Sequence, residues 1–402
     1  MSEWKEYKLD EIADIYNNKR IPLSSIVRSK RQGKYPYYGA SGIVDYIDDY
    51  IFDGDYILIS EDGENLRSRK TPIAFRAQGK FWVNNHAHII QGKDKFLNNW
   101  ISYFFKNLNV SPYLTGAVQP KLNKENLLRI PIPIPDFESA SIITEILSSL
   151  DDKIELNNNI NKELEKLAQT LFKQWFIEFE FPDENGEPYQ SSGGEMVESE
   201  LGMIPKNWEV RKLSALIRLT GGGTPKRSNA EYWDGKIKWF SIQDIPNDSQ
   251  VFVVDTKEKI TELGLNKSST KLLPRGTTII TARGTVGKLA LVAEPMAMNQ
   301  SCYGVNGASG LGEFYTYFNL KNAVEKLRQN VHGAVFDTIT SNTFDTIKSI
   351  YGNNDLANLF EEIVRPMMEQ IENHCRENQE LSNLRDTLLP KLISGELNVK
   401  DL

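Results

Sequence analysis

The sequence repeats itself over two halves of about 200 residues, and this duplication limits the fold more than any other feature. Trp4-Lys5-Glu6-Tyr7-Lys8-Leu9 has a counterpart in Trp208-Glu209-Val210-Arg211-Lys212-Leu213. Gly116-Ala117-Val118 recurs 217 positions later as Gly333-Ala334-Val335, and the same shift places Thr170-Leu171 on Thr387-Leu388. A period of this length is too long for a solenoid. A chain of 402 residues can also bury two cores, so the repeat predicts two homologous halves.

Each half is predicted to contain a globular part followed by a long helix. Short β-prone runs such as Tyr56–Ile59 and Thr278–Thr281 accompany single helices such as Trp100–Leu108 and Phe314–Gln329. We therefore expect an α+β fold, with two similar mixed α/β domains joined by two long helices in an intramolecular antiparallel coiled coil of pseudo-twofold symmetry. The expected boundaries are domain 1 at 1–140, a first spacer helix at 141–180, an acidic linker at 181–205, domain 2 at 206–355 and a second spacer helix at 356–402.

The two helical stretches carry narrow apolar seams with heptad spacing, which fit an antiparallel pair. The predicted seam residues are Leu147, Leu150, Ile154, Asn157, Asn161, Leu164 and Leu171 in the first helix, and Val364, Met367, Ile371, His374, Asn378, Leu381 and Leu388 in the second. The alternative is that each seam packs on its own globular domain. Both seams turn polar near the middle, and a buried polar layer lowers stability but fixes alignment. We predict that this layer sets how the helices align.

Charge is segregated along the chain, although 47 basic and 54 acidic residues give a net charge of −7. No acidic residue occurs in 15–44 or in 265–293, and both stretches contain several Lys and Arg. Residues 175–205 are the reverse, acidic without a single Lys or Arg. Solvated loops are the alternative explanation for any one such stretch. One basic stretch in each half favours nucleic acid as the partner.

The motifs of a DNA-modifying enzyme are missing from the sequence. It has neither a glycine loop for a methyl donor nor a polar-Pro-Pro-aromatic strip beside a flipped base. Gly284-Thr285-Val286-Gly287-Lys288 lacks the first glycine and the hydroxyl residue of a phosphate loop. The chain has only four histidines, among them His86 and His88, which leaves few ligands for a metal cluster. We expect this chain to hold no catalytic residue, metal or cofactor.

Composition also limits the location of the protein. No run approaches the roughly 20 apolar residues of a membrane span, so we expect no membrane association. The charged N-terminal segment is unlike a secretory signal, and Cys302 and Cys375 cannot form a disulfide framework. A cytoplasmic location is therefore expected.

Several motifs resemble the specificity subunits of type I restriction-modification systems, in that family's order and over nearly the whole chain. In the first half they are Tyr35-Pro36-Tyr37-Tyr38-Gly39-Ala40-Ser41-Gly42, Ser60-Glu61-Asp62-Gly63 and Thr115-Gly116-Ala117-Val118-Gln119-Pro120-Lys121-Leu122. In the second half they are Gly222-Gly223-Thr224-Pro225, Tyr232-Trp233, Ile237-Lys238-Trp239, Ala282-Arg283-Gly284-Thr285-Val286-Gly287-Lys288 and Leu388-Leu389-Pro390-Lys391-Leu392-Ile393-Ser394-Gly395.

The resemblance implies a non-catalytic DNA-binding subunit with two target recognition domains, each reading one half of a bipartite duplex target. It implies that the helices set the spacing of the half-sites and dock two modification subunits, which methylate adenine N6 with S-adenosylmethionine. Two restriction subunits that use ATP and Mg²⁺ would complete the complex.

The candidate DNA-binding residues combine basic residues with polar residues of the matched motifs. They are Lys19, Arg20, Arg28, Lys30, Arg31, Tyr38, Ser41 and Lys121 in the first domain, and Thr224, Lys226, Arg227, Ser228, Arg283 and Lys288 in the second. Two other functions remain open at this point. One is a coiled-coil scaffold with two protein- or glycan-binding lobes, and the other is a nuclease or methyltransferase with unrecognised motifs.

Overall fold

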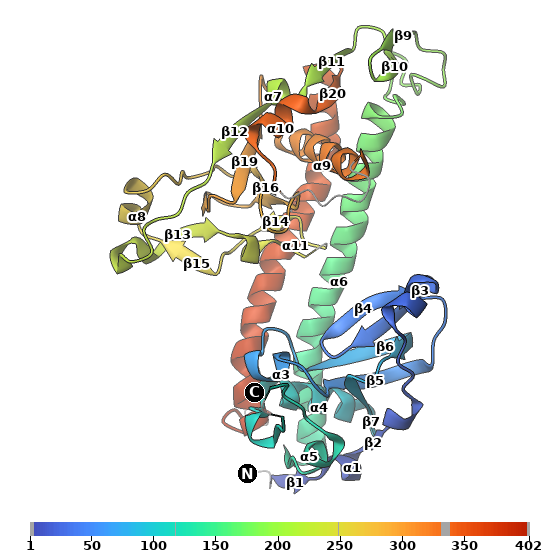
Figure 1. Cartoon of the computed structure of the whole chain (residues 1–402), viewed down its shortest axis with the longest axis vertical. Helices are drawn as coiled ribbons and strands as arrows, with labels where there is room; N and C mark the ends of the chain where they lie inside the picture. The colour runs from blue at the N-terminus through green and yellow to red at the C-terminus, as the bar shows by residue number, and fades with distance from the viewer. Residues whose placement is uncertain (1–3, 117, 248, 331–337, 400–402) are drawn as a thin grey trace. The chain divides into compact units, whose positions relative to one another are not determined.

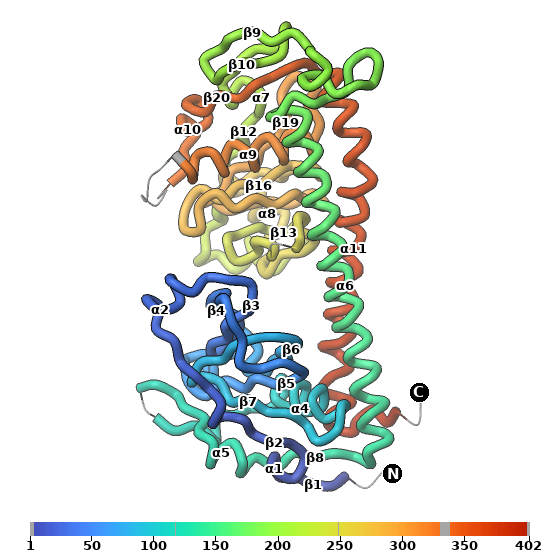
Figure 2. The backbone as a smooth tube through the Cα atoms, turned by 90° about the vertical axis from the view of Figure 1, so that its right-hand side faces the viewer, coloured from blue at the N-terminus to red at the C-terminus, as the bar shows by residue number. Residues whose placement is uncertain are grey.

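The computed structural model describes residues 4–116, 118–247, 249–330 and 338–399, and the chain divides into two compact units (Figures 1 and 2). Unit 1 comprises Met1–Asp152 and Leu381–Leu402, and unit 2 comprises Lys153–Glu380. Each unit contains a mixed α/β domain and one segment of each of two long helices, which confirms the predicted fold class. The repeated motif Gly333-Ala334-Val335 and Ala117 lie outside the described residues.

Unit 1 is built on a six-stranded sheet of order β2-β7-β5-β6-β3-β4. Its strands are β2 (Ala13–Ile15), β3 (Gln32–Gly39), β4 (Gly42–Ile47), β5 (Phe52–Ser60), β6 (Ala74–Val83) and β7 (Ala87–Gly92). Neighbouring strands are antiparallel except β3 and β6, which are parallel. The other elements are the antiparallel pair β1 (Lys5–Tyr7) and β8 (Ile132–Ile134), α1 (Leu9–Ile12), η1 (Asn17–Lys19), α2 (Ser25–Ser29), α3 (Asn65–Ser68), α4 (Lys95–Asn107), η2 (Ser111–Tyr113) and α5 (Lys124–Leu128).

The core of unit 1 lies between its sheet and α4. Apolar side chains recur along α4 at helical spacing, and Trp100 and Phe105 are completely buried. Leu147 and Leu392, one from each long helix, are completely buried in the same cluster. Both long helices therefore contribute to the core of this unit.

Unit 2 contains a five-stranded sheet of order β12-β19-β16-β17-β14 and a three-stranded sheet of order β15-β13-β18. These strands are β12 (Ile217–Gly221), β13 (Trp233–Phe240), β14 (Phe252–Val253), β15 (Glu258–Ile260), β16 (Thr278–Thr281), β17 (Leu289–Val292), β18 (Ala297–Met298) and β19 (Cys302–Gly307). Two further antiparallel pairs join β9 (Met196–Ser199) to β10 (Gly202–Pro205), and β11 (Glu209–Lys212) to β20 (Lys348–Tyr351). The helices are α7 (Leu213–Leu216), η3 (Ala230–Tyr232), η4 (Ile242–Asp244), α8 (Glu262–Asn266), α9 (Glu313–Asn330) and α10 (Ser341–Thr346).

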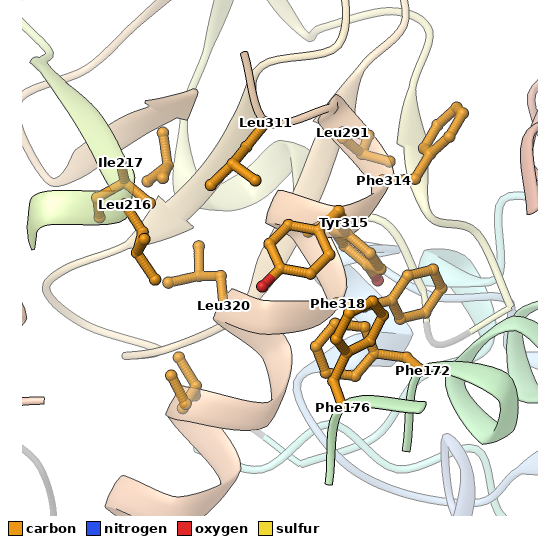
Figure 3. Close-up of a cluster of buried hydrophobic side chains, with 14 of the residues drawn as sticks. Phe172, Phe176, Leu216, Ile217, Leu291, Leu311, Phe314, Tyr315, Phe318 and Leu320 are labelled. Carbon is orange, nitrogen blue, oxygen red and sulfur yellow. The ribbon is translucent and has the colours of Figure 1, made fainter. Parts of the chain in front are cut away.

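Aromatic side chains dominate the core of unit 2, where α9 packs against the long helices (Figure 3). The ring centroids of Phe172 and Phe318 lie 6.2 Å apart, and those of Phe176 and Tyr315 lie 5.0 Å apart. Phe360 from the second long helix lies 5.6 Å from Phe172. This cluster attaches α9 to both long helices of the unit.

The two units share one strand arrangement, which confirms the internal duplication. The order β2-β7-β5-β6-β3 in unit 1 matches β12-β19-β16-β17-β14 in unit 2, and in each case only the last pair is parallel. The helix that follows β7 is α4, and the helix that follows β19 is α9. We call these five strands the common frame. The segments inserted into it differ, because β4 occurs in unit 1 and β13, β15 and β18 occur in unit 2.

The long helices are α6 (Phe137–Phe176) and α11 (Asn354–Ser394), where 141–180 and 356–402 were expected. The Asp136 carboxylate accepts the backbone N–H of Ser139 at 2.8 Å, which caps the start of α6. After α6, Phe179 has a φ of 57°, which helical backbone does not adopt. Gly395 follows α11 with a φ of 78°, the left-handed conformation that ends helices at glycine.

Within each unit, the segments of α6 and α11 run antiparallel. In unit 1, Asp151 pairs with Arg385. In unit 2, Asn157 bonds to Asn378 and Asn161 bonds to His374, so residue numbers rise along one helix as they fall along the other. The fourteen predicted seam residues, which the sequence analysis names, are all buried or partly buried.

The polar layer in unit 2 is hydrogen-bonded across the helix pair. The Asn157 amide donates to Asn378 Oδ1 at 2.9 Å and to Glu377 at 2.7 Å. His374 Nδ1 lies 2.8 Å from Asn161 Oδ1, and burial lowers the pKa of His374, which favours its neutral form. Asn157, Asn161 and Asn378 are at most 2% exposed. These bonds form in one alignment only, since a slip would leave buried amides without partners.

Among the described residues, no helix is long and apolar enough to cross a membrane.

We predict that Asn161→Leu combined with Asn378→Leu raises the free energy of unfolding by about 1–2 kcal/mol and permits a second helix alignment, because apolar contacts replace the directional bonds. Denaturant unfolding measures the first effect. Disulfide crosslinking measures the second, with cysteines at positions 171 and 364 for the native alignment and at 171 and 371 for a slip of one heptad. Asn159→Leu, on the exposed side of α6, is the control. Crosslinks in the native alignment alone would contradict the prediction.

Candidate nucleic-acid interface

In unit 1, the segments that follow β2, β3 and β5 meet the turn that precedes β7. Arg20, after β2, donates to the carbonyl oxygens of Asn85 and Ala87 at 3.2 and 3.0 Å. The backbone N–H of Glu61, after β5, donates to the carbonyl of His86 at 2.9 Å. The Ser60 hydroxyl donates to the carbonyl of Ala40, next to Ser41. The antiparallel and parallel pairings of one curved sheet thus gather loops that are far apart in sequence.

Five side chains at this end form what we call the strand-end cluster of unit 1: Arg20, Glu61, Asp62, His86 and Lys121. Glu61 accepts from Arg20 at 2.5 Å and lies 3.3 Å from the Lys121 ammonium. His86 Nδ1 lies 2.9 Å from the Asp62 carboxylate. Lys121 and His86 are about half exposed, whereas Glu61 and Arg20 are largely buried. The cluster therefore has a buried ionic base and an exposed polar surface.

Burial and neighbouring charges determine the protonation states of Glu61 and of His88 beside it. Burial alone would raise the pKa of Glu61, but the hydrogen bond and positive charge of Arg20, with the hydrogen bond from Lys121, lower it. Burial also lowers the pKa of His88, so its imidazole stays neutral. The neutral ring donates from Nε2 to the Leu122 carbonyl at 2.7 Å and accepts from Asn17 at 2.8 Å. Glu61 is therefore a stable anion that fixes the direction of Arg20 and Lys121.

Unit 2 repeats this arrangement with different side chains. After β12, the backbone N–H of Gly223 donates to the Met298 carbonyl at 2.9 Å, and Thr224 hydrogen-bonds to Gln300. After β16, the N–H of Ala282 donates to the Ser301 carbonyl at 2.8 Å, which places Arg283 beside the same turn before β19. We call Thr224, Arg283 and Gln300 the strand-end cluster of unit 2. It occupies the same place in the common frame as the cluster of unit 1.

The structure brings some predicted DNA-binding residues of unit 1 together and separates others. Arg20 and Lys121 belong to the strand-end cluster, and Tyr38 and Ser41 lie beside it, since the Tyr38 carbonyl accepts from Asn84 at 3.0 Å. Tyr38 is packed between Phe75 and Phe81.

The other four basic candidates of unit 1 lie elsewhere. Arg28 is in α2 and pairs with Asp45 of β4 at 2.9 Å, and Arg31 pairs with Asp48 at 2.8 Å. Lys30 lies between them, and Lys19 ends η1 with its ammonium 4.9 Å from the Tyr16 ring centroid. Arg28 and Arg31 also cover the rings of Tyr37 and Trp82, at 5.0 and 5.2 Å. Within the described part of the chain the Lys30 side chain has no such partner.

In unit 2, Arg227 is the most firmly held of the candidates. Its guanidinium lies 3.9 Å from the Trp233 ring and 5.1 Å from the Trp239 ring, and it binds both carboxylate oxygens of Glu258. The hydrogen bond to Glu258 raises the pKa of Arg227. Lys226 and Ser228, on either side, are exposed. Arg227 therefore holds its loop in one conformation and presents its neighbours to solvent.

The loop from Ala282 to Lys288 connects β16 to β17 and is not followed by a helix, so it is no phosphate loop. Gly284 and Gly287 have φ angles of 73° and 76°, which the tight turn requires. The N–H of Lys288 donates to the Thr281 hydroxyl at 2.9 Å, and Arg328 donates to the carbonyls of Val286 and Gly287 at 3.1 and 3.0 Å. The loop is thus held in one conformation that leaves Arg283 exposed.

Sequence reasoning missed the carboxylates that hold these basic residues. The sequence places Glu61 and Asp62 in a motif without indicating a role for either, and suggests His86 only as a possible metal ligand. Nothing in the sequence near Glu258 pointed to Arg227, which lies 31 residues away. Across the described ranges no group of three or more His, Cys, Asp or Glu side chains could hold a metal ion.

Comparison with known proteins shows the family. The profile of the type I restriction modification DNA specificity domain matches residues 1–166 and again 205–350, and the chain belongs to this family. The two matched segments correspond to the two halves of the duplication. Membership supports a DNA-specificity function over the scaffold with protein- or glycan-binding lobes.

Curated relatives cover the whole chain. It is 25% identical to the type I restriction enzyme HindI specificity subunit of Haemophilus influenzae, over 99% of this chain and 100% of that protein. It is 26% identical to the MjaIX specificity subunit of Methanocaldococcus jannaschii, over 100% and 95% of the two chains. The crystal structure of a type I restriction-modification S subunit from M. genitalium has a TM-score of 0.59, with 16% identity over 97% and 96% of the chains, and shares the fold.

We predict that Glu61→Gln lowers the free energy of unfolding by about 1–3 kcal/mol at neutral pH, because it leaves Arg20 with a weaker partner in a largely buried site. Since the folded pKa of Glu61 lies below its unfolded value, its stabilisation is present above about pH 4.3 and is lost as the pH falls through the folded pKa. The variant should therefore lose stability less steeply in acid than the parent protein. Denaturant unfolding between pH 3 and pH 7 measures both effects, and parallel curves would contradict the prediction.

Proposed function

We propose that this chain is the sequence-reading subunit of a type I restriction-modification complex and that each unit reads one half of a bipartite duplex target. The observation that carries the proposal is the duplicated common frame, with polar and basic candidates at the same strand ends in both units. A bipartite target needs two reading surfaces, and two copies of one frame supply them. The cytoplasm, where such a complex meets DNA, is the location we propose.

The arginines and lysines are assigned different parts in this binding. Arg20, Arg28 and Arg227 are held by carboxylates, so they shape the loops. Lys30 and Lys226 are exposed and have no side-chain partner among the described residues, so they suit phosphate oxygens. Base edges are then read by exposed polar side chains, such as Ser228 beside Arg227 and Ser41 beside the strand-end cluster of unit 1.

The long helices are proposed to set the separation of the half-sites. Helices of 40 and 41 residues extend about 60 Å at 1.5 Å per residue. Half-sites one DNA turn apart are separated by roughly 34 Å, so helices of this length are long enough to span that distance.

Exposed apolar side chains on these helices are proposed to bind the modification subunits. In unit 2, Leu156 and Leu167 of α6 are 54% and 53% exposed, and Leu359 and Ile363 of α11 are 41% and 40% exposed. The leucines of α6 are 11 residues apart, which is close to three turns, so they share one face. Clustered exposed apolar side chains mark protein interaction sites.

The catalytic reactions of the complex are proposed to be carried out by the modification and restriction subunits. Two modification subunits would carry S-adenosylmethionine and methylate adenine N6, and two restriction subunits would use ATP and Mg²⁺. Mapping methylated adenines in a host genome with and without this chain identifies the target and tests the proposal directly. Methylation that is independent of this chain would contradict it.

Once the target is known, inserting four residues into both helices, after Asp152 and after Glu380, should lengthen the preferred spacer by about one to two base pairs. Four residues add about 6 Å, against 3.4 Å per base pair. Four residues also complete about one turn, so each helix face keeps its direction. Methylation of duplexes with spacers of graded length measures the preference. A two-residue insertion, which turns the faces by about half a turn, is the control. An unchanged spacer preference would count against the proposed role of the helices.

The two classes of basic residue should behave differently in DNA binding. Lys226→Ala should weaken binding to matched and mismatched duplexes alike and reduce the slope of log K against log salt by about 1. Arg227→Ala should release its loop and reduce discrimination between matched and mismatched duplexes by about 1–3 kcal/mol. Binding titrations at several salt concentrations measure both. Equal losses on all duplexes for Arg227→Ala would assign it to phosphate binding instead.

A further inference from the structure

In unit 1, a tyrosine of the recognition domain bonds to a carboxylate of the long helix α6. The Tyr103 hydroxyl of α4 donates to Asp151 at 2.8 Å, and the Lys106 ammonium lies 3.4 Å from the same carboxylate. Arg385 of α11 also donates to Asp151, at 2.5 Å. Tyr103 is 4% exposed, and the three charged side chains are 20–29% exposed. We call Tyr103, Lys106 and Asp151 the clamp of unit 1.

In unit 2, α9 makes the same type of contact with α6. The Tyr317 hydroxyl donates to Glu165 at 2.8 Å, and the Lys321 ammonium lies 2.6 Å from the same carboxylate oxygen. Tyr317 is 4% exposed and the Glu165 side chain is 12% exposed. Lys321 follows Tyr317 by one helical turn, as Lys106 follows Tyr103, so each pair shares a helix face. We call Tyr317, Lys321 and Glu165 the clamp of unit 2.

The tyrosines are repeat equivalents, but the carboxylates are not. Ser102-Tyr103-Phe104 of α4 corresponds to Thr316-Tyr317-Phe318 of α9, 214 positions later. The repeat equivalent of Asp151 would lie on α11, where the position 217 residues later is Met368. Glu165 likewise corresponds to Ser382. The second clamp is therefore not a copy of the first, and both carboxylates come from α6. Both units therefore contain a tyrosine–carboxylate bond to α6, although the two carboxylates are not equivalent in the repeat. This recurrence indicates that the bond has a function in each unit.

The two phenols and the Asp151 carboxylate are held in the protonation states that these bonds require. Burial raises the pKa of both tyrosines, so each phenol remains protonated and able to donate. Burial would raise the pKa of Asp151, but Lys106, Arg385 and Tyr103 together lower it, so the acceptor remains ionised. Hydrogen bonds between a neutral donor and a carboxylate are short and directional.

Apolar packing alone does not supply this directional restraint. The rings of Phe172, Phe176 and Phe318 attach α9 to α6 (Figure 3), but hydrophobic contact depends on buried area more than on direction. A buried phenol that loses its acceptor is left unsatisfied, which opposes any rotation of α9. The clamp thus allows one orientation of the domain helix on α6.

We propose that the two clamps consist of positioning residues that fix the orientation of each recognition domain on α6, and that they thereby restrict the spacer lengths at which both half-sites are read. This inference rests on the proposed function. It assigns to Tyr103 and Tyr317 a part in the choice of spacer, with no part in reading bases.

The test uses the full chain in complex with its modification subunits. Tyr103→Phe and Tyr317→Phe, singly and together, remove the bond and keep the ring. We expect the double variant to lose about tenfold in the ratio of methylation at the preferred spacer to methylation at spacers one base pair longer or shorter, because a charge-assisted bond is lost in each unit. The half-site sequences preferred should stay the same. A purely structural role would lower activity on all spacers equally.

Two controls are available in the same chain. Tyr303→Phe removes the hydroxyl of a partly buried tyrosine of unit 2 that lies outside the clamps. Glu163→Gln neutralises a carboxylate of α6 that is 72% exposed, for comparison with Glu165→Gln. Neither control should change the spacer ratio. If a Tyr→Phe variant fails to fold, Lys321→Met and Glu165→Gln provide the same comparison.

An unchanged spacer ratio in folded clamp variants would overturn the inference, and so would a changed half-site sequence. If the parent complex itself shows no target-dependent methylation, the proposed function fails and not the clamp alone.

Discussion

The side-chain amides of Asn157, Asn161 and Asn378 hydrogen-bond across the pair of α6 and α11 segments in unit 2, and the packing of both cores depends on the alignment in which these bonds form. A slip of one heptad would move each helix by about 10 Å relative to its partner. In unit 2 it would separate Phe172 from Phe360, and in unit 1 it would break the pair of Asp151 and Arg385. Both cores include side chains from both helices, so an error in alignment would disturb each of them. We predict that burying these amides lowers stability but restricts the helices to one alignment.

Most of the ion pairs described above fix the position of a loop or a helix. Glu61, Glu258 and Asp45 each hold an arginine of a candidate DNA-binding loop, and the clamps hold α4 and α9 on α6. The Arg20–Glu61 and Arg28–Asp45 pairs and the clamps are partly or largely buried, where an unpaired charge is destabilising, so their loops and helices have few alternative positions. Arg227 and Glu258 are 55% and 40% exposed and hold their loop at the surface. The exposed Lys30 and Lys226 have no such carboxylate partner among the described residues.

The structural features that the sequence predicted correctly are those that depend on the periodicity of apolar and polar residues. The heptad seams predicted the antiparallel helices, and the two polar positions in each seam predicted the hydrogen-bonded layer. The β-prone runs predicted strands such as β5 and β16. The parallel pairing of β3 with β6 was beyond prediction, because no local pattern encodes which distant strand is the neighbour. The strand-end cluster of unit 1 depends on the equally non-local pairing of β7 with β2 and β5, so Glu61 and His86 are not recognisable from the sequence as part of the candidate site. The clamps join residues 48 and 152 positions apart, and no sequence pattern near Asp151 or Glu165 predicts its tyrosine partner.

The common frame tolerates very different insertions after its first strand. Unit 1 places η1 and α2 there, whereas unit 2 places η3 and β13 there, and in both units the five shared strands keep their order. Changes in this connection leave the frame and the long helices intact. Each unit has its own core, so the insert of one unit can change while the strand frame of the other stays the same. Two independently variable inserts multiply the number of different surfaces that one chain of this design can present.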